Sequence, residues 1–162
     1  MDNVLRPIEV GGGRREAYLG AAHRLIDLLG LDAVANRKAA DLPPGMQQRA
    51  SLCRALIYDP PILLLDEPFG ALDRDTRTTM NAELQRIWLA RRKTVLMITH
   101  NIEEAIYLAD GVMVMSPRPG RIVAEVVVDF SRPRLSDLID SPAFRRLAAA
   151  IRHHLRTSGS DA

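Results

Sequence analysis

A run of apolar residues that ends in two adjacent carboxylates limits the possible folds of this chain more than any other stretch. Ile62 to Leu65 are four consecutive apolar residues behind Pro60-Pro61, and Asp66 and Glu67 follow at once. Four residues are too few for an amphipathic helix, so the run predicts a strand buried on both faces of a parallel sheet. Ligands bind beyond the carboxyl ends of such strands, where the two acids are expected. Taken alone, a strand ending in a solvated polar turn explains the same residues.

The composition sets broad limits on function. Hydrophobic residues make up 47% of the 162 and charged residues 26%, which is typical of a soluble globular domain. The 22 basic and 20 acidic residues are interspersed, so a nucleic-acid partner is not expected. The single cysteine, Cys53, excludes an internal disulfide and suits a reducing cytosol. No apolar run is long enough to cross a bilayer, so any membrane connection is expected through a partner.

A second strand is predicted to bring a histidine to the two acids. Thr94 to Thr99 has the pattern of another buried strand and is followed by His100. A long helix lies between the strands, with Asp73 placed to cap it. Strand, helix and strand in this order imply parallel pairing, so His100 is expected at the same sheet edge as Asp66 and Glu67. The buried face of the helix is predicted at Met80, Leu84, Ile87 and Trp88.

The part of the chain before these strands is predicted to be helical. Residues 3–10 form a mixed segment, and Gly11 to Gly13 is a linker because no Gly-Lys-Ser/Thr follows it, as a phosphate loop requires. Helical spacing predicts one helix from Glu16 to Gly30. A second helix follows Gly45, whose turn is either an anion site or an ordinary proline-led helix start. Its predicted apolar stripe, Met46, Ala50, Cys53 and Ile57, makes Cys53 an inert core thiol.

The last third is predicted to contain a hairpin between two helices. Asn101 with Glu104 is typical of a capping box that opens a short helix. Residues 111–115 and 121–128 predict hairpin strands, and residues 131–134 break the pattern. Ser141-Pro142 predicts the start of a last helix. The apolar stripe of that helix is expected at Phe144, Leu147, Ile151 and Leu155.

Three motifs in this order and spacing resemble one family. They are Leu-Pro-Pro-Gly-Met-Gln-Gln-Arg at 42–49, Leu-Leu-Leu-Asp-Glu-Pro-Phe-Gly-Ala-Leu-Asp at 63–73, and Ile-Thr-His-Asn-Ile-Glu-Glu-Ala at 98–105. Together they resemble the ATP-binding subunit of an ABC transporter, over residues 3–155. The Ser-Arg-Pro-Arg and Ser-Pro-Ala-Phe stretches resemble the nitrate, sulfonate and taurine importer branch.

The resemblance implies an α/β fold of the P-loop NTPase type, with a parallel sheet flanked by helices and part of an ABC α-helical subdomain. Residues 1–59 would be the partial helical subdomain with the signature helix, and residues 60–130 the core with the Walker B and histidine motifs. Residues 131–162 would be a C-terminal helical extension.

The resemblance also implies roles for the acids and the histidine. Asp66 would hold Mg²⁺, Glu67 would be the general base, and His100 would be the switch histidine near the γ-phosphate of ATP. These components suit phosphoryl transfer, which requires neutralised charge and a positioned water. The remaining nucleotide-side and dimer-contacting positions would be Gly45, Met46, Gln47 and Asp73.

Two departures from the family pattern weaken nucleotide binding. The family reads Leu-Ser-Gly-Gly where this chain has Leu42-Pro43-Pro44-Gly45, so a hydroxyl and a backbone N–H are missing. The Walker A strand, its lysine-bearing loop and the Q-loop glutamine precede this region in the family, and the 162 residues contain no Gly-Lys-Ser/Thr. The chain resembles the back two-thirds of an N-terminally truncated nucleotide-binding domain, which should leave an unpaired sheet edge.

The function implied is that of an ATP-binding and ATP-hydrolysing subunit of an importer for a nitrate, sulfonate or taurine-like solute. Such a subunit works as a dimer under an integral-membrane permease, at the cytoplasmic face of the membrane, and is linked indirectly to a solute-binding protein. One alternative is a non-catalytic remnant or assembly module that no longer binds ATP. Another is a metal-dependent hydrolase that uses Asp66, Glu67 and His100.

Overall fold

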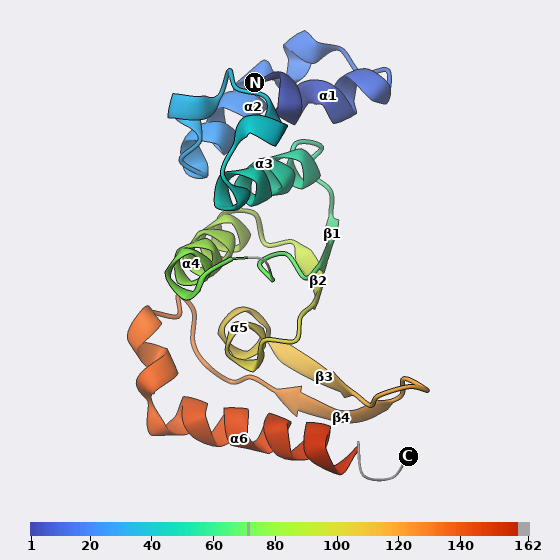
Figure 1. Ribbon diagram of the computed structural model, residues 1–162, viewed down its shortest axis with the longest axis vertical. Coiled ribbons are helices and arrows are strands. Elements are labelled where there is room, and N and C mark those ends of the chain that lie inside the picture. Colours follow the sequence, from blue (N-terminus) through green and yellow to red (C-terminus); the bar gives the residue numbers. More distant parts are fainter. Residues whose placement is uncertain (71, 159–162) are drawn as a thin grey trace.

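The computed structural model describes residues 1–70 and 72–158, without the side chains of residues 2 and 3. In Figure 1 the helices α3, α4 and α5 lie to the left of the strands, and α6 runs below the hairpin of β3 and β4. The helices of the first part are α1 (Asp2–Val10), α2 (Arg15–Leu28) and α3 (Pro44–Leu56), with short 3₁₀ turns at Asp32–Val34 and Ala39–Asp41. The rest is β1 (Ile62–Asp66), α4 (Arg74–Arg91), β2 (Thr94–Ile98), α5 (Ile102–Leu108), β3 (Gly111–Met115), β4 (Ile122–Val127), a 3₁₀ turn at Ser136–Asp140, and α6 (Pro142–Thr157).

The first three helices form a packed unit at one end of the molecule. The segment expected to be mixed is the helix α1, and its Leu5 and Ile8 are fully buried. The helix α3 begins with Pro44 at its first turn, as a proline-led start requires. Cys53 on α3 is fully buried, and burial raises the pKa of its thiol to about 12. The predicted inert core thiol is thus confirmed.

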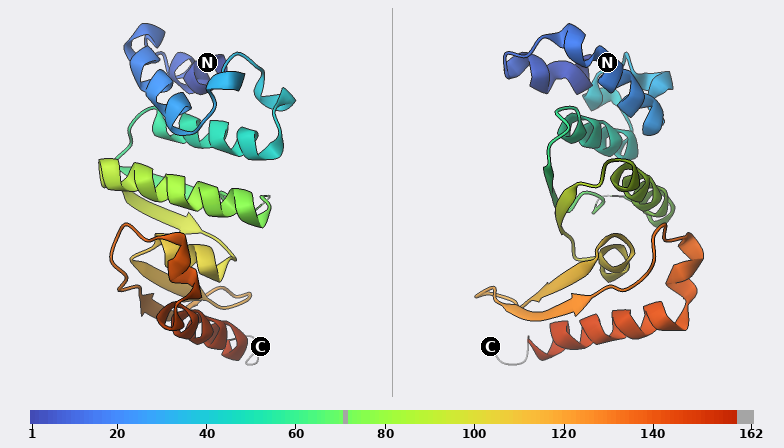
Figure 2. Two further views of the ribbon diagram at one scale, coloured as in Figure 1. Left: turned by 90° about the vertical axis from the view of Figure 1, so that its left-hand side faces the viewer. Right: turned by 180° about the vertical axis from the view of Figure 1, so that it is seen from behind.

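The strands β1 and β2 form a parallel pair, as the chain order predicted. The expectation that both strands are buried on both faces is wrong. Leu63 is buried and Val95 is half-buried on the helix side, whereas Leu64 and Leu96 on the other side are 70% and 59% exposed. The pleat sends alternate side chains to opposite faces, and α3 and α4 cover one face only (Figure 2).

The hairpin β3–β4 and the helices α5 and α6 share a second hydrophobic cluster. The antiparallel pairing of β3 with β4 confirms the predicted hairpin. Phe144 and Ile151 of α6 are buried against it, and Ser141 caps the helix by accepting a hydrogen bond from the Phe144 N–H at 3.1 Å. Leu155, expected on the buried stripe, is 41% exposed because the cluster ends at Ile151.

A buried arginine joins the parts of this second cluster. Arg134 is only 2% exposed, and its guanidinium donates to the carbonyl oxygens of Ile106, Tyr107 and Ala109 at 2.7 to 3.1 Å. Gln85 of α4 bonds to both backbone polar groups of Arg134, at 2.6 and 2.8 Å. Residues 131–134, which the sequence predicted only to interrupt the strand pattern, therefore connect α4 to α5.

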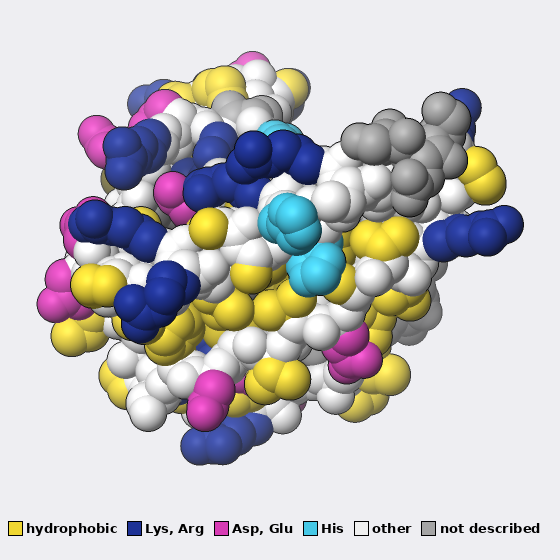
Figure 3. All heavy atoms as spheres, turned by 90° about the horizontal axis from the view of Figure 1, so that it is seen from below, with side chains coloured by type: hydrophobic (Ala, Val, Ile, Leu, Met, Phe, Trp, Pro, Cys, Tyr) yellow, Lys and Arg dark blue, Asp and Glu magenta, His cyan; other side chains and the backbone are white. Residues whose placement is uncertain are grey.

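Among the described residues, no helix is long and apolar enough to cross a membrane. Seen from the α6 end (Figure 3), Lys and Arg side chains are spread over the surface between apolar and acidic ones.

Candidate nucleotide-hydrolysis site

The acid after β1 and the histidine after β2 meet at one edge of the parallel pair. Glu67 Oε1 accepts from the backbone N–H of His100 at 3.0 Å and lies 2.8 Å from His100 Nδ1. The register places Asp66 opposite Ile98, so both strands end at the same level. The side chains of Glu67 and His100 are 39% and 76% exposed, which leaves both open to a ligand. The sequence predicted this meeting from strand order alone.

The backbone of Glu67 adopts a conformation that is uncommon for a residue with a side chain. Its φ is 43°, in the left-handed region, while its N–H still donates to Ile98 O at 2.9 Å. Its Oε2 atom is buried and has no hydrogen-bond partner in the described structure. A Cβ at Gly70 would lie 3.3 Å from this oxygen, so glycine leaves the carboxylate its room. Strain combined with an unsatisfied buried oxygen is typical of a functional position.

Asp66 is the last residue of β1, and it is exposed. Its position in the strand puts it on the same face as Leu64, which no helix covers. The carboxylate is therefore accessible from the bare side of the sheet, next to the Glu67–His100 pair.

The remaining candidates form a second group at the starts of α3 and α4. Gly45 packs toward α4, since a Cβ there would lie 3.3 Å from Thr76 Cγ2. Pro43 and Pro44 have no N–H, so Gly45 supplies the first backbone donor of α3, and the N–H of Met46 bonds to Pro43 O at 2.9 Å. The side chain of Gln47 turns back to donate to Leu42 O at 2.8 Å.

Asp73 caps α4, as the sequence predicted. Its carboxylate accepts from the Thr76 N–H at 3.0 Å and from the Thr76 hydroxyl at 2.7 Å. These backbone and side-chain bonds lower the pKa of Asp73. Ala71, between the acids and this cap, lies outside the described residues.

Sequence reasoning missed three side chains around the site. Gln48 donates to the backbone oxygen of Pro68 and so connects α3 to the loop after Glu67. Thr99 accepts from the Asn101 N–H at 3.0 Å and stabilises the turn that carries His100. Glu104 is 3% exposed, although capping residues usually lie at the surface. The contact of Gln48 joins two residues that are distant in sequence, and the contact of Thr99 takes the place of the predicted capping box. Residue spacing alone therefore does not reveal either contact.

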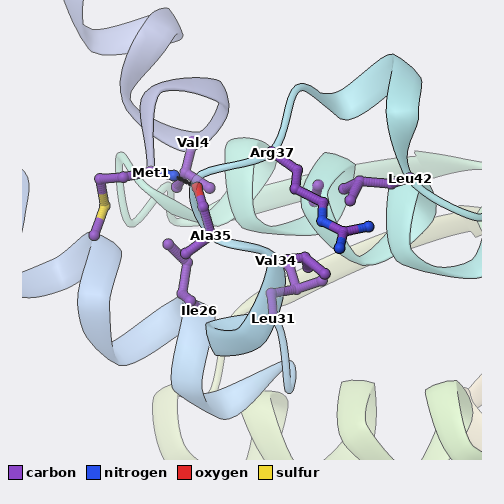
Figure 4. Close-up of a pocket in the computed structure, with 9 residues that line it drawn as sticks. Met1, Val4, Ile26, Leu31, Val34, Ala35, Arg37 and Leu42 are labelled. Atoms are coloured by element: carbon purple, nitrogen blue, oxygen red, sulfur yellow. Dashed lines mark hydrogen bonds between the residues drawn. The ribbon is translucent and has the colours of Figure 1, made fainter.

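A small pocket lies away from this edge, among the helices of the first part (Figure 4). The Met1 ammonium donates to Ala35 O beside it. Its lining is almost entirely apolar, which does not suit a phosphate group: Met1, Val4, Ile26, Leu31, Val34, Ala35, Arg37, Leu42 and Ala50.

Comparison with solved structures shows the fold. The chain superimposes on a metal-chelate type ABC transporter in an inward-facing conformation with a TM-score of 0.62 and 25% identity, over 69% of this chain and 46% of that one. It also superimposes on an ATP-binding cassette of an ABC transporter in its ADP conformation, with a TM-score of 0.58 and 22% identity. That superposition covers 79% of this chain and 48% of the cassette. The expected α/β fold is therefore that of ABC ATP-binding domains.

Comparison of sequences shows the family. Residues 5–70 match the model of the ABC transporter family. The taurine import ATP-binding protein TauB of Rhizobium johnstonii is 43% identical over 98% of this chain and 62% of its own length. An uncharacterized ABC transporter ATP-binding protein of Methanocaldococcus jannaschii is 39% identical over 90% of this chain and 55% of its own length. The chain thus spans somewhat more than half of these relatives, and it belongs to the ATP-binding subunits of ABC transporters, in the branch that includes the taurine import proteins.

Proposed function

We propose that this chain supplies the hydrolytic half of an ATP-hydrolysing importer subunit. The observation that carries the proposal is the bond between Glu67 and His100 at the ends of two parallel strands. In this proposal Glu67 is the general base that takes a proton from the attacking water. His100 orients Glu67 and donates toward the γ-phosphate oxygens, where negative charge develops.

Magnesium fits this proposal with Asp66 as its protein ligand. Mg²⁺ is commonly bound by one or two carboxylates together with substrate phosphates and water. The described residues contain no cluster of three or more metal-ligating side chains, whereas Asp66 is an exposed carboxylate beside the candidate base. When bound, the metal would neutralise charge on the phosphates.

The phosphate-binding loop is proposed to come from a polypeptide segment outside these residues, on the same subunit or on a separate chain. Two observations support this. The first is the length of TauB, of which this chain covers 62%. The second is the side of β1 and β2 that no helix covers. The apolar side chains of Leu64 and Leu96 are exposed there, as is typical of a surface that packs against another polypeptide segment.

The partners follow from family membership and the names of the relatives. Two such subunits would work as a dimer under an integral-membrane permease, and a solute-binding protein would take part indirectly. The chain would be peripheral, at the cytoplasmic face of the membrane. A taurine-type solute is the candidate cargo because TauB proteins are similar over most of this chain. Gly45, Met46, Gln47 and Asp73 would face the nucleotide and the second subunit.

Calorimetry and reconstitution together test the proposal. The isolated chain is expected to bind Mg-ATP weakly or not at all, because the described residues offer no phosphate cradle. Adding a segment with a Walker A loop, fused to Met1 or as a separate chain, should produce ATP hydrolysis. Glu67→Gln should lower that turnover at least about a hundredfold.

Glu103→Gln is the matched control, since Glu103 is an exposed acid on α5. Turnover should be unchanged in this variant. Micromolar ATP binding by the isolated chain would contradict the need for a second segment. An assembly that hydrolyses ATP equally well with Glu67→Gln would exclude Glu67 as the base.

A further inference from the structure

The backbone at Glu67 has a conformation that its local sequence does not favour. A residue with a side chain rarely has a positive φ, and the φ of Glu67 is 43°. Pro68 follows directly, and a proline drives the residue before it toward an extended conformation. Contacts from other parts of the fold are therefore needed to hold this peptide in place.

Two of these contacts come from the sheet and from the turn itself. The Glu67 N–H donates to Ile98 O at 2.9 Å, which continues the pairing of β1 with β2. The Glu67 carbonyl oxygen accepts from the Gly70 N–H at 3.2 Å and closes a tight turn. Both bonds act on the backbone of Glu67 and leave the carbonyl group of Pro68 to another partner.

That partner is a glutamine on α3. The Gln48 side chain is half-buried, and its amide nitrogen donates to the carbonyl oxygen of Pro68. A carbonyl oxygen accepts only from the NH₂ end of an amide, which fixes the orientation of the Gln48 side chain. The ring of Pro68 fixes the φ of that residue, so holding its carbonyl group also restricts the preceding peptide of Glu67.

The same face of α3 packs along the rest of this loop. Gly45 lies three residues before Gln48 and therefore on the same face of the helix. A Cβ at Gly45 would lie 3.8 Å from Leu72 Cδ2, and Arg77 of α4 donates to Leu72 O at 2.7 Å. The loop that begins at Pro68 is thus connected to helices at both ends, by Gln48 at one and by Arg77 at the other.

We propose that Gln48 is a positioning residue for the candidate base Glu67 and acts through the carbonyl group of Pro68. The inference rests on the proposed function for its catalytic consequence, because it takes Glu67 as the base. Its structural part depends on the contacts alone. Gln48 thereby connects the start of α3, where the second subunit is proposed to bind, to the Glu67–His100 pair.

Two substitutions separate the hydrogen bond from simple packing. Gln48→Met keeps the length of the side chain and removes the donor, whereas Gln48→Lys keeps a donor. If Gln48 only fills space, methionine is the better replacement at this half-buried position. If the bond matters, lysine is better. Arg54→Gln is the control, because Arg54 lies further along α3 and donates to Ser51 of the same helix at 2.6 Å.

Amide hydrogen exchange on the intact chain measures how firmly the loop and the carboxylate are held. The Gly70 amide bonds to Glu67 O, and the His100 amide bonds to Glu67 Oε1. Both amides should exchange about tenfold faster in Gln48→Met and within about threefold of wild type in Gln48→Lys. Arg54→Gln should leave both rates unchanged. Amides in the middle of α4 report whether each variant is folded.

The exchange data decide the matter in either direction. Unchanged rates in Gln48→Met would overturn the proposal, and so would equally fast exchange in Gln48→Lys. A faster Gly70 amide with an unchanged His100 amide would also overturn it, because Gln48 would then hold the loop without orienting the Glu67 carboxylate. Should Gln48→Met fail to fold, Gln48→Glu decides, since an ionised glutamate keeps the shape and has no donor. Unchanged His100 exchange in that variant would overturn the proposal.

The hydrolysis assay of the reconstituted assembly gives the functional readout. Gln48→Met should lower kcat about ten- to a hundredfold and leave KM within about twofold, because a misplaced base slows the chemical step more than binding. Combined with Glu67→Gln, it should lower kcat no further, since both changes act on one step. A wild-type kcat in Gln48→Met, or an additive loss in the double variant, would contradict the positioning role. If the wild-type assembly itself is silent, the proposed function fails, while the exchange experiment still decides the role of Gln48.

Discussion

At the scale of single residues, the candidate site is marked by conformational strain. Glu67 has a φ of 43° and a buried oxygen without a partner, while Gly70 leaves room for its carboxylate. A non-glycine residue in the left-handed region costs about 1 to 3 kcal/mol, and such strain persists where function requires it. The contact between Glu67 and His100 is exposed to solvent, so it offsets little of this energetic cost.

Glu67→Gly should therefore stabilise the isolated chain, by about 1 kcal/mol. Urea unfolding measures the change. Arg92→Gly is the comparison, because Arg92 has a φ of 44° at the C-terminal end of α4, remote from the candidate site in sequence and role. If Arg92→Gly raised the free energy of unfolding while Glu67→Gly lowered it, the contacts of the Glu67 side chain would outweigh its backbone strain.

At the scale of secondary-structure elements, Arg134 holds the second hydrophobic cluster together. It satisfies carbonyl oxygens at the end of α5, where a helix leaves them without partners. Burial lowers the pKa of Arg134 to about 10, with the charge of Arg132 adding to the effect, so the guanidinium remains protonated at neutral pH. The Tyr107 hydroxyl donates to Arg134 O at 2.6 Å and fixes the backbone as well.

Arg134→Met should lower the free energy of unfolding by at least about 3 kcal/mol, because several buried carbonyl oxygens lose their donor at once. Chemical denaturation checks this. Arg145→Met on the exposed side of α6 should change the same quantity by less than about 0.5 kcal/mol. A loss below 1 kcal/mol for Arg134→Met would mean that water replaces the guanidinium without much cost.

At the scale of the whole molecule, the side of β1–β2 away from the helices is a bare apolar surface. Ile62, Leu64, Leu96 and Ile98 are each more than half exposed on adjacent parallel strands. Surfaces of this kind are sites of association or of aggregation. The isolated chain is therefore expected to self-associate at high concentration.

Opposite charges placed on this surface should reduce that association. Leu64 and Leu96 are direct cross-strand neighbours, so Leu64→Lys with Leu96→Glu adds a favourable pair and removes apolar area. Sedimentation velocity should show more monomer in the double variant. Leu135→Lys, at an exposed leucine outside both sheets, should not alter the distribution. An equal effect of both changes would point to general solubility and not to this surface.

Much of the fold could be predicted from the sequence, because its signals are local. Helical spacing located α2, α3 and α4, and cap residues located the starts of α4 and α6. The order of two strands and their final residues predicted that His100 would meet Glu67, since parallel strands end at the same edge. Motif spacing was enough to indicate the family.

Only the tertiary structure decided what each polar or apolar side chain faces. A local motif assigned Glu104 to a capping box, whereas in the tertiary structure this residue is only 3% exposed. The pattern break at 131–134 contains the most buried arginine of the described chain. The run at Ile62–Leu65 showed a strand but not whether a second layer covers it. Periodicity records which residues are apolar, whereas burial depends on contacts between segments distant in sequence, which no local pattern contains.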